Sequence, residues 1–246
     1  MQLTELVGEP ATGRIFEQAL MPGIADADGG GRVRLDAIAR WLQDVAYADL
    51  LDAGFDEQGV WIVRRMRLRV GAFPRFGEPV TLRTFCSGLG RFSAERRTTV
   101  RGPASSVDAV ALWIWIDEQG RPARVGERFA ELYGESAGGR GATVRLRHPE
   151  PPTMLERSTW TFRAADVDIA GHVNNSHYWS VLEERLVGAE PGAIDAEIEH
   201  REPAQPGVGS IAGDHSQGLW IEGGDGAVHA SIQLAERPRR VARLQS

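Results

Sequence analysis

Hydrophobic residues recur at the spacing of one helix face in two parts of the chain. In the first part they are Leu35, Ile38, Ala39, Leu42, Val45, Ala46 and Leu50, ahead of Gly54. In the second part they are Tyr178, Val181, Leu182 and Leu186, ahead of Gly188 and Pro191. Spacings of three and four residues predict amphipathic helices, here over about residues 35–53 and 175–187, which the glycines and the proline then end.

Segments with the composition of β-strands follow each predicted helix. After the first helix they are residues 60–70, 80–87, 92–101 and 109–117. After the second they are residues 193–200, 210–215, 219–222 and 227–234. Glycine-containing stretches at residues 118–120 and 223–226 predict hairpins or loops. One helix followed by a run of strands, found twice, predicts an α+β fold in which each helix packs across an antiparallel sheet.

A short motif precedes both predicted helices. Residues 26–33 read DADGGGRV and residues 166–173 read DVDIAGHV, so two aspartates, a glycine and a valine match without gaps. The repeat indicates two related halves. Between them, residues 134–152 are rich in Gly, Ser, Arg and Pro, which is typical of a linker. We therefore expect an N-terminal unit over residues 1–135, a linker over 136–154 and a C-terminal unit over 155–246.

Composition narrows the class of protein. The 246 residues suffice for one large domain or two of about 100 residues each. No apolar run approaches the roughly 18 residues of a membrane span, and the N-terminus lacks a signal-peptide pattern. The single cysteine, Cys86, allows no internal disulfide and fits a reducing cytoplasm. A net charge of −6 argues against a general nucleic-acid binder. We expect a cytoplasmic protein without a membrane span.

Three stretches resemble the acyl-acyl-carrier-protein thioesterases of plants and bacteria, which are tandem hotdog folds. They are residues 60–66 with 73–78, residues 111–117, and residues 166–178, the last with the pattern His-Val-Asn-Asn at 172–175. The resemblance as a whole covers about residues 12–215. The resemblance implies an α+β tandem hotdog fold and the hydrolysis of fatty acyl chains from acyl-carrier protein, to which they are linked through phosphopantetheine. It implies neither a cofactor nor a metal.

The resemblance also assigns the catalytic residues. It places Asp168 and His172 at the family's catalytic aspartate and histidine. Residues 198–203 resemble the strand that ends in the family's catalytic glutamate, which carries that role to Glu202. We assign Glu202 to the activation of water, against the alternative of an exposed carboxylate paired with Arg201 or another arginine.

Thioester hydrolysis also needs a site for the developing oxyanion. Residues 170–175 lead into a helix, whose first amides are free to donate hydrogen bonds. We expect amides near Gly171–Val173 to polarise the thioester carbonyl, with Gly171 allowing close approach of the backbone. Asn174 or Asn175 would cap the helix. The alternative is that Asp166, Asp168 and the asparagines only satisfy turns and caps. We favour that alternative for Asp166 and the asparagines.

Two positions depart from the family pattern. Ala170 stands where the family commonly has an asparagine, so an amide that could hold the water or the carbonyl is absent. Backbone, a water or Asn174 replaces it, or activity is weak or altered. Pro203 stands where plant members often have a cysteine, which leaves no cysteine nucleophile in the matching region. These residues favour direct attack by water over an acyl-enzyme.

The repeat assigns different roles to the two halves. Aligning the motifs places Arg32 opposite His172, and aligning the prolines after the strands places Phe73 opposite Glu202. The first half therefore lacks both groups, and we interpret it as the non-catalytic half that lines an acyl-chain tunnel.

Residues along the strand at 60–70 alternate between two faces. Met66, Leu68 and Val70 should face the apolar side. Arg65, Arg67 and Arg69 should form a solvated face, or one that meets an acidic carrier protein or the phosphopantetheine phosphate.

Two other classes of function remain open. One is a hotdog enzyme that acts on other thioesters, either an acyl-CoA thioesterase or a dehydratase or hydratase. The other is a non-catalytic protein that binds acyl thioesters, which Ala170 makes credible. A homodimer is compatible with each of these functions.

Overall fold

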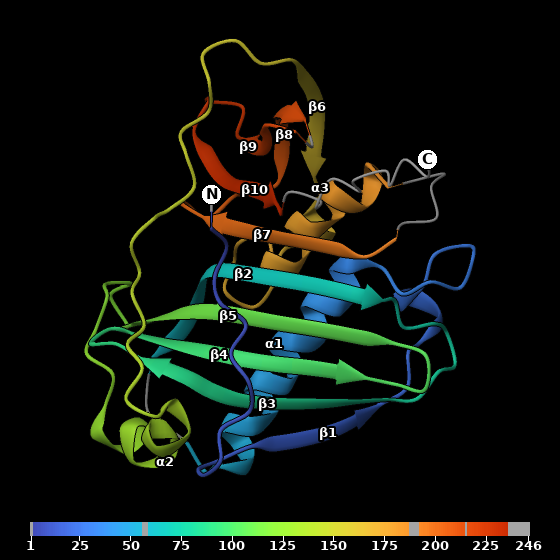
Figure 1. The fold of residues 1–246 in the computed structure, drawn as a ribbon. Helices are drawn as coiled ribbons and strands as arrows, with labels where there is room; N and C mark the ends of the chain where they lie inside the picture. Colours follow the sequence, from blue (N-terminus) through green and yellow to red (C-terminus); the bar gives the residue numbers. More distant parts are fainter. Residues whose placement is uncertain (1, 56–58, 187–191, 215, 236–246) are drawn as a thin grey trace, which may run out of the picture.

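A computed structural model describes residues 2–55, 59–186, 192–214 and 216–235. Its strands form one ten-stranded antiparallel sheet in the order β1-β3-β4-β5-β2-β7-β10-β9-β8-β6 (Figure 1). The first-half strands are β1 (Phe16–Leu20), β2 (Val60–Ala72), β3 (Val80–Leu89), β4 (Ser93–Arg101) and β5 (Ser106–Ile116). The second-half strands are β6 (Arg157–Phe162), β7 (Ile194–His200), β8 (Gly207–Asp214), β9 (Gly218–Glu222) and β10 (Val228–Leu234).

The two halves meet where β2 pairs with β7. Their register runs from Arg65 opposite Glu199 to Val70 opposite Ile194. This pairing joins the units into one continuous sheet, which confirms the expected α+β arrangement. All the predicted strands are present within a few residues of their expected bounds, although His215, at the end of one of them, lies outside the described residues.

Two helices cover one face of the sheet near this junction. The first is α1 (Leu35–Asp52), as the hydrophobic spacing predicts. The second begins as a 3-10 turn, Asn175–Tyr178, and continues as α3 (Trp179–Glu184). Leu186 is half-buried against the core, whereas residue 187 and the expected terminators Gly188 and Pro191 lie outside the described residues.

The main core lies between these helices and the sheet. Met66, Leu68 and Val70 of β2 are buried there with Trp179 and Leu182, as their alternation along the strand predicts. Burial of these side chains stabilises the helices on the sheet by roughly 1.5–3 kcal/mol for each large residue. Among the described residues, none of the helices is long and apolar enough to cross a bilayer.

The prediction for the opposite face of β2 is wrong for Arg65. This side chain is buried and bonds the Glu199 carboxylate, with 2.7 Å between Nη2 and Oε2. Arg67 pairs in the same way with Asp195 at 2.7 Å. The cause is that β7 places acidic residues at alternate positions, directly opposite the arginines of β2. Only Arg69 remains exposed, and it pairs with Asp108.

The N-terminal segment and the stretch after the helix α2 (Glu127–Ala137) cover this second face of the sheet (Figure 1). The Thr4 amide donates to Glu197, and the amides of Arg147 and His148 donate to Glu199. The helix α2 (Glu127–Ala137) extends into the beginning of the expected linker, and the chain is irregular from there to β6. The proposed domain boundaries stay a prediction.

Candidate active site

The segment at residues 166–174 folds into a tight turn before the second helix. The Asp168 amide donates to the His172 carbonyl and the Gly171 amide donates to the Asp168 carbonyl, both at 3.0 Å. Gly171 has a φ of 76°, a left-handed conformation that favours glycine. The Asn174 amide closes the segment by donating to the Asp166 carbonyl. We call residues 168–172 the site turn.

The first half contains the same turn in three dimensions. The Asp28 amide donates to the Arg32 carbonyl, and the Gly31 amide donates to the Asp28 carbonyl. The valine after each turn also bonds a loop that follows a strand: Val33 donates to Pro74, and Val173 donates to Ala204. The sequence repeat is therefore a structural repeat.

This repeat corrects one detail of the alignment. Because Pro74 and Ala204 accept the equivalent bonds, Phe73 lies opposite Pro203, and Ala72 lies opposite Glu202. The sequence alignment was wrong by one residue, because it matched prolines rather than hydrogen bonds. The first half still has no carboxylate at the position of Glu202.

Asn174 holds the site turn to the helix and to the other half of the chain. Its Oδ1 accepts from the Ser176 amide at 2.9 Å, so Asn174 is the helix cap that the sequence predicts. Its Nδ2 donates to Asp168 Oδ2 at 2.9 Å and to Gln43 Oε1 at 3.3 Å. Sequence reasoning missed Gln43, because its partner lies in the other half and helical spacing alone gives it no distinguishing feature.

The two aspartates stabilise backbone in this segment. Asp166 is buried and accepts from the Arg163 amide at 2.8 Å and from the Arg163 guanidinium at 2.9 Å. Burial acts to raise the pKa of Asp166, but the bonds from Arg163 outweigh it and hold that pKa below its usual value. Asp168 is half-buried and accepts from the Ala170 amide at 2.8 Å. The bonds of Asp166 all serve to stabilise this segment. Asp168 also bonds the turn, but its side chain is partly exposed to solvent.

The loop after β7 packs directly on the site turn. Besides the bond from Val173 to Ala204, Gln205 Nε2 donates to the Gly171 carbonyl at 3.2 Å. Arg64 fixes the preceding strand end, because its Nη1 donates to the carbonyls of His200 and Arg201 at 2.9 and 3.3 Å. The strand end that carries Glu202 thus lies against the turn that carries His172.

His172 and Glu202 are both exposed. Within the described part of the chain, neither side chain forms a hydrogen bond or an ion pair, so Glu202 is not held by Arg201 as the alternative proposed; Arg201 pairs with Glu150 instead. Both groups are free to meet a substrate.

The amides of the site turn are mostly engaged. Those of Ala170, Gly171 and Val173 donate to Asp168 Oδ1, the Asp168 carbonyl and the Ala204 carbonyl. Within Gly171–Val173, His172 is the residue whose amide donates to no protein group among the described residues; in the rest of the turn the same holds for Ile169. The expected oxyanion donor is thereby narrowed from Gly171–Val173 to the His172 amide.

Two buried aromatic side chains, Tyr178 and His200, lie beside the loop after β7. Tyr178 accepts a bond from the Ala204 amide at 3.2 Å, and its ring packs edge-on against His200, with centroids 4.8 Å apart. Burial, aided by the nearby charge of Arg64, lowers the pKa of His200 to about 3. Burial also raises the pKa of Tyr178 to about 12. Both rings are therefore neutral near pH 7.

The one cysteine of the chain, Cys86, is buried. Burial raises the pKa of the Cys86 thiol to about 11, which makes it a poor nucleophile. No cluster of three His, Cys, Asp or Glu side chains in the described ranges is arranged to hold a metal ion.

Comparisons with known proteins bear on the same regions. Family models match as the acyl-ACP thioesterase N-terminal domain over residues 13–133 and the acyl-ACP thioesterase C-terminal domain over residues 150–208. An uncharacterized protein of Mycobacterium tuberculosis is 25% identical over 207 residues, covering 82% of this chain and 83% of that protein. The chloroplastic oleoyl-acyl carrier protein thioesterase 2 of Arabidopsis thaliana is 23% identical, over 58% of this chain and 46% of that protein.

A solved structure supports the fold. The 12:0-ACP thioesterase of Umbellularia californica aligns with a TM-score of 0.70 at 16% identity, covering 92% of this chain and 94% of that one. At this identity the likeness supports the tandem hotdog architecture and leaves the substrate open.

Proposed function

Because the chain belongs to the acyl-ACP thioesterase family, whose two domain models match it in order, we propose that it hydrolyses fatty acyl thioesters carried by acyl-carrier protein. The family supports fatty acyl thioester hydrolysis as the reaction class. The proposal goes further in two respects. It names acyl-carrier protein as the carrier, and it names Asp168, His172 and Glu202 as the catalytic residues.

The reaction runs by direct attack of water. Glu202 takes a proton from the water as its oxygen bonds to the thioester carbonyl carbon. The amide of His172 stabilises the oxyanion that forms. When the carbon–sulfur bond breaks, the departing pantetheine sulfur takes a proton, which the His172 side chain donates, and the products are a fatty acid and the free thiol. The proton that Glu202 took from water then passes to His172, which restores both groups. Asp168 holds the site turn in place through Ala170 and Asn174.

The observation that carries this proposal is the contact between the site turn and the loop after β7. Hydrogen bonds from Val173 to Ala204 and from Gln205 to Gly171 bring the regions of His172 and Glu202 together at one end of the sheet. Both side chains are exposed, which a substrate requires. The equivalent contact in the first half lies beside Arg32 and Ala72, which offer no general base. Catalysis is therefore assigned to the C-terminal half.

Thiol release tests the proposal. The purified chain should release thiol from acyl-carrier proteins loaded with saturated and unsaturated acyl chains of several lengths, and do so faster than from the matching acyl-CoA esters. Faster hydrolysis of the CoA esters would show that coenzyme A, and not acyl-carrier protein, is the preferred carrier. The reaction, thioester hydrolysis, would be the same. Release of no thiol from either, with water added across an enoyl thioester instead, would identify a hydratase. Binding without any reaction would identify an acyl-binding protein.

A further inference from the structure

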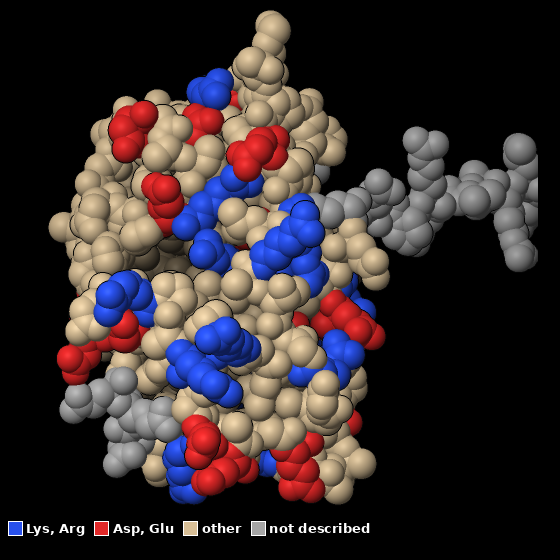
Figure 2. All heavy atoms as spheres, turned by 90° about the vertical axis from the view of Figure 1, so that its left-hand side faces the viewer, with Lys and Arg blue, Asp and Glu red and all other residues tan. Residues whose placement is uncertain are grey.

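Four exposed arginines lie at the end of the sheet where β7 ends. They are Arg91, Arg124, Arg145 and Arg147, which we call the arginine face. Figure 2 looks onto this end of the molecule and shows basic side chains gathered across its middle, with acidic side chains mainly toward its margins. The chain as a whole carries a net charge of −6, so this is a local reversal of sign.

The arginines of this face form no ion pair within the described part of the chain, although the guanidinium of Arg91 also lies over the ring of Phe92. In the described part of the chain, none of the four guanidinium groups has a carboxylate within ion-pair distance, whereas most of the other arginines do, such as Arg14, Arg67 and Arg157. Unpaired like charges that lie close together repel one another and create a positive potential. An arrangement that costs stability in the isolated molecule points to a partner of opposite charge.

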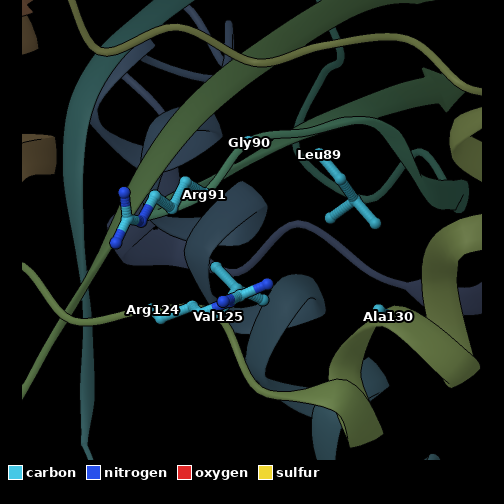
Figure 3. A pocket seen from close by; sticks show the side chains of 6 residues that line it. All are labelled: Leu89, Gly90, Arg91, Arg124, Val125 and Ala130. Atoms are coloured by element: carbon cyan, nitrogen blue, oxygen red, sulfur yellow. The ribbon is translucent and has the colours of Figure 1, made fainter.

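Two of the four arginines border a hollow. Arg91 comes from the turn between β3 and β4, and Arg124 comes from the loop before α2 (Figure 3). Together with Leu89, Val125 and Ala130 they line a space of about 500 Å³ that opens to solvent. Asp168, His172 and Glu202 do not line it. The hollow is therefore separate from the candidate site.

The other two arginines lie on the stretch that crosses the sheet toward Glu202. This stretch bridges Leu89 of β3 at Gly141, and its Arg145 carbonyl accepts from Arg65 of β2 at 2.6 Å. Three strand spacings separate β3 from β2, which is roughly 14 Å at about 4.8 Å per strand. The arginine face is thus wider than a single phosphate group, and it fits the surface of an acidic protein.

The arginine face also borders the candidate site. The Arg147 amide donates to Glu199 near the end of β7, and Arg201 Nη2, next to Glu202, donates to the His148 carbonyl at 3.3 Å. A protein that docked here would hold its prosthetic arm beside His172 and Glu202.

We infer that the arginine face is the docking surface for the body of an acidic carrier protein, so that the enzyme recognises the carrier as well as the pantetheine thioester. This inference rests on the proposed function, because that function supplies the reason for a carrier to dock. Arg65 and Arg67 are not part of this docking surface. The alternation along β2 had suggested them for contact with the carrier, but both are paired with acidic residues inside the protein.

Two double variants and a matched control test the inference. The variants Arg91→Glu with Arg124→Glu, and Arg145→Glu with Arg147→Glu, should each raise KM for acyl-carrier protein by about tenfold or more, since charge reversal slows association. Raised salt should shrink the difference from the unmodified protein. The control is Arg75→Glu with Arg185→Glu, an equal change of charge at exposed, unpaired arginines beyond the other end of β2 and after α3.

The substrates separate the outcomes. Hydrolysis of an acyl-pantetheine without phosphate, and of acyl-CoA, should stay within about twofold of the unmodified rate in both double variants. An equal loss with acyl-CoA would show that the arginines bind phosphate and would overturn docking of the carrier body. No change with acyl-carrier protein, or an equal loss in the control, would overturn it as well.

Direct binding keeps the inference testable if the proposed function fails. If the unmodified protein hydrolyses no thioester, calorimetric titration with loaded acyl-carrier protein replaces the rate. Binding that both double variants weaken and the control keeps would support the docking surface. Absent or unchanged binding would overturn it.

Discussion

Within the segment from Asp166 to Asn175, side chains divide into those that hold the backbone and those that are free to act. Asp166 and Asn174 use their polar atoms on Arg163, Ser176 and neighbouring groups. His172 extends into solvent from the turn they fix. The density of polar residues ahead of an apolar helix thus reflects the bonds that one short turn and one helix start require.

Ala170 provides a residue-scale prediction. Its side chain is exposed and its φ is negative, so asparagine fits there without backbone strain. Asn174 does not replace the missing amide, because both of its polar atoms are already bonded. Ala170→Asn should therefore raise kcat on acyl-carrier protein by about tenfold, through one added contact to the transition state.

The neighbouring Ile169 is fully exposed and supplies the control for this change. Ile169→Asn should leave kcat unchanged, because the side-chain amide of the new asparagine would point into solvent. A lower or equal rate for Ala170→Asn, in an active enzyme, would show that the missing amide does not limit turnover.

His200 predicts how stability depends on pH. Its folded-state pKa is near 3 while its ordinary value is 6.5, so between these values the unfolded chain binds a proton that the folded chain does not. Stability must therefore fall as pH drops below about 6.5. Between pH 7 and pH 5 this one group should remove about 2 kcal/mol from the free energy of unfolding.

Urea unfolding of the unmodified protein and of His200→Gln at both pH values measures that contribution. The variant should lose about 2 kcal/mol less than the unmodified protein on acidification, and the two should have parallel pH dependence above pH 7.5. Equal losses from pH 7 to pH 5 would show that His200 is accessible to protons in the folded state.

At the scale of elements, the start of the second helix depends on one cap. Asn174→Ala should lower the free energy of unfolding by about 1–2 kcal/mol, since it removes the cap and the bond to Asp168. The adjacent Asn175→Ala is a matched control, because within the described structure the Asn175 side chain makes no hydrogen bond. Chemical denaturation compares the two, and equal effects would contradict the assignment of the cap.

The sequence predicted elements well where burial leaves a periodic pattern. The helix α1 and the strand β2 have such patterns, because each has one face in the core. The edge strands β1 and β6 are mostly exposed, and therefore show no alternation. The helix α2 buries only a few residues, and its last residues lie where Gly and Ser suggested a linker.

The candidate site shows the same limit. Asp168, His172 and Glu202 stand in short local motifs and could be found from the sequence. Gln43 and Arg64 could not, because they reach the site through contacts between the two halves of the chain. The pairing of Arg65 with Glu199 was missed for the same reason.

At the scale of the whole molecule, the junction of β2 and β7 makes the two halves one folded unit. Arg65→Met should lower the free energy of unfolding by about 3–5 kcal/mol, because it leaves Glu199 buried without its cation. Arg69→Met, on the same strand face but half-exposed and weakly paired, should cost less than about 1 kcal/mol.

Urea unfolding followed by fluorescence and circular dichroism measures both variants. The two probes should report one shared transition in the unmodified protein, because the sheet is continuous. Separate transitions for the two halves, or equal costs for the two variants, would contradict the role assigned to this junction.

The central claim is that the C-terminal half hydrolyses a thioester with Glu202 as the base, and the rate of thiol release by Glu202→Gln tests it most directly. The control is Glu150→Gln, which neutralises another exposed carboxylate at the same end of the sheet. On acyl-carrier protein, Glu202→Gln should lower kcat by about 10²–10⁴-fold, with an unchanged circular dichroism spectrum, while Glu150→Gln stays near the unmodified rate. A Glu202→Gln variant that retains near-full activity, or a control that loses as much, would contradict it.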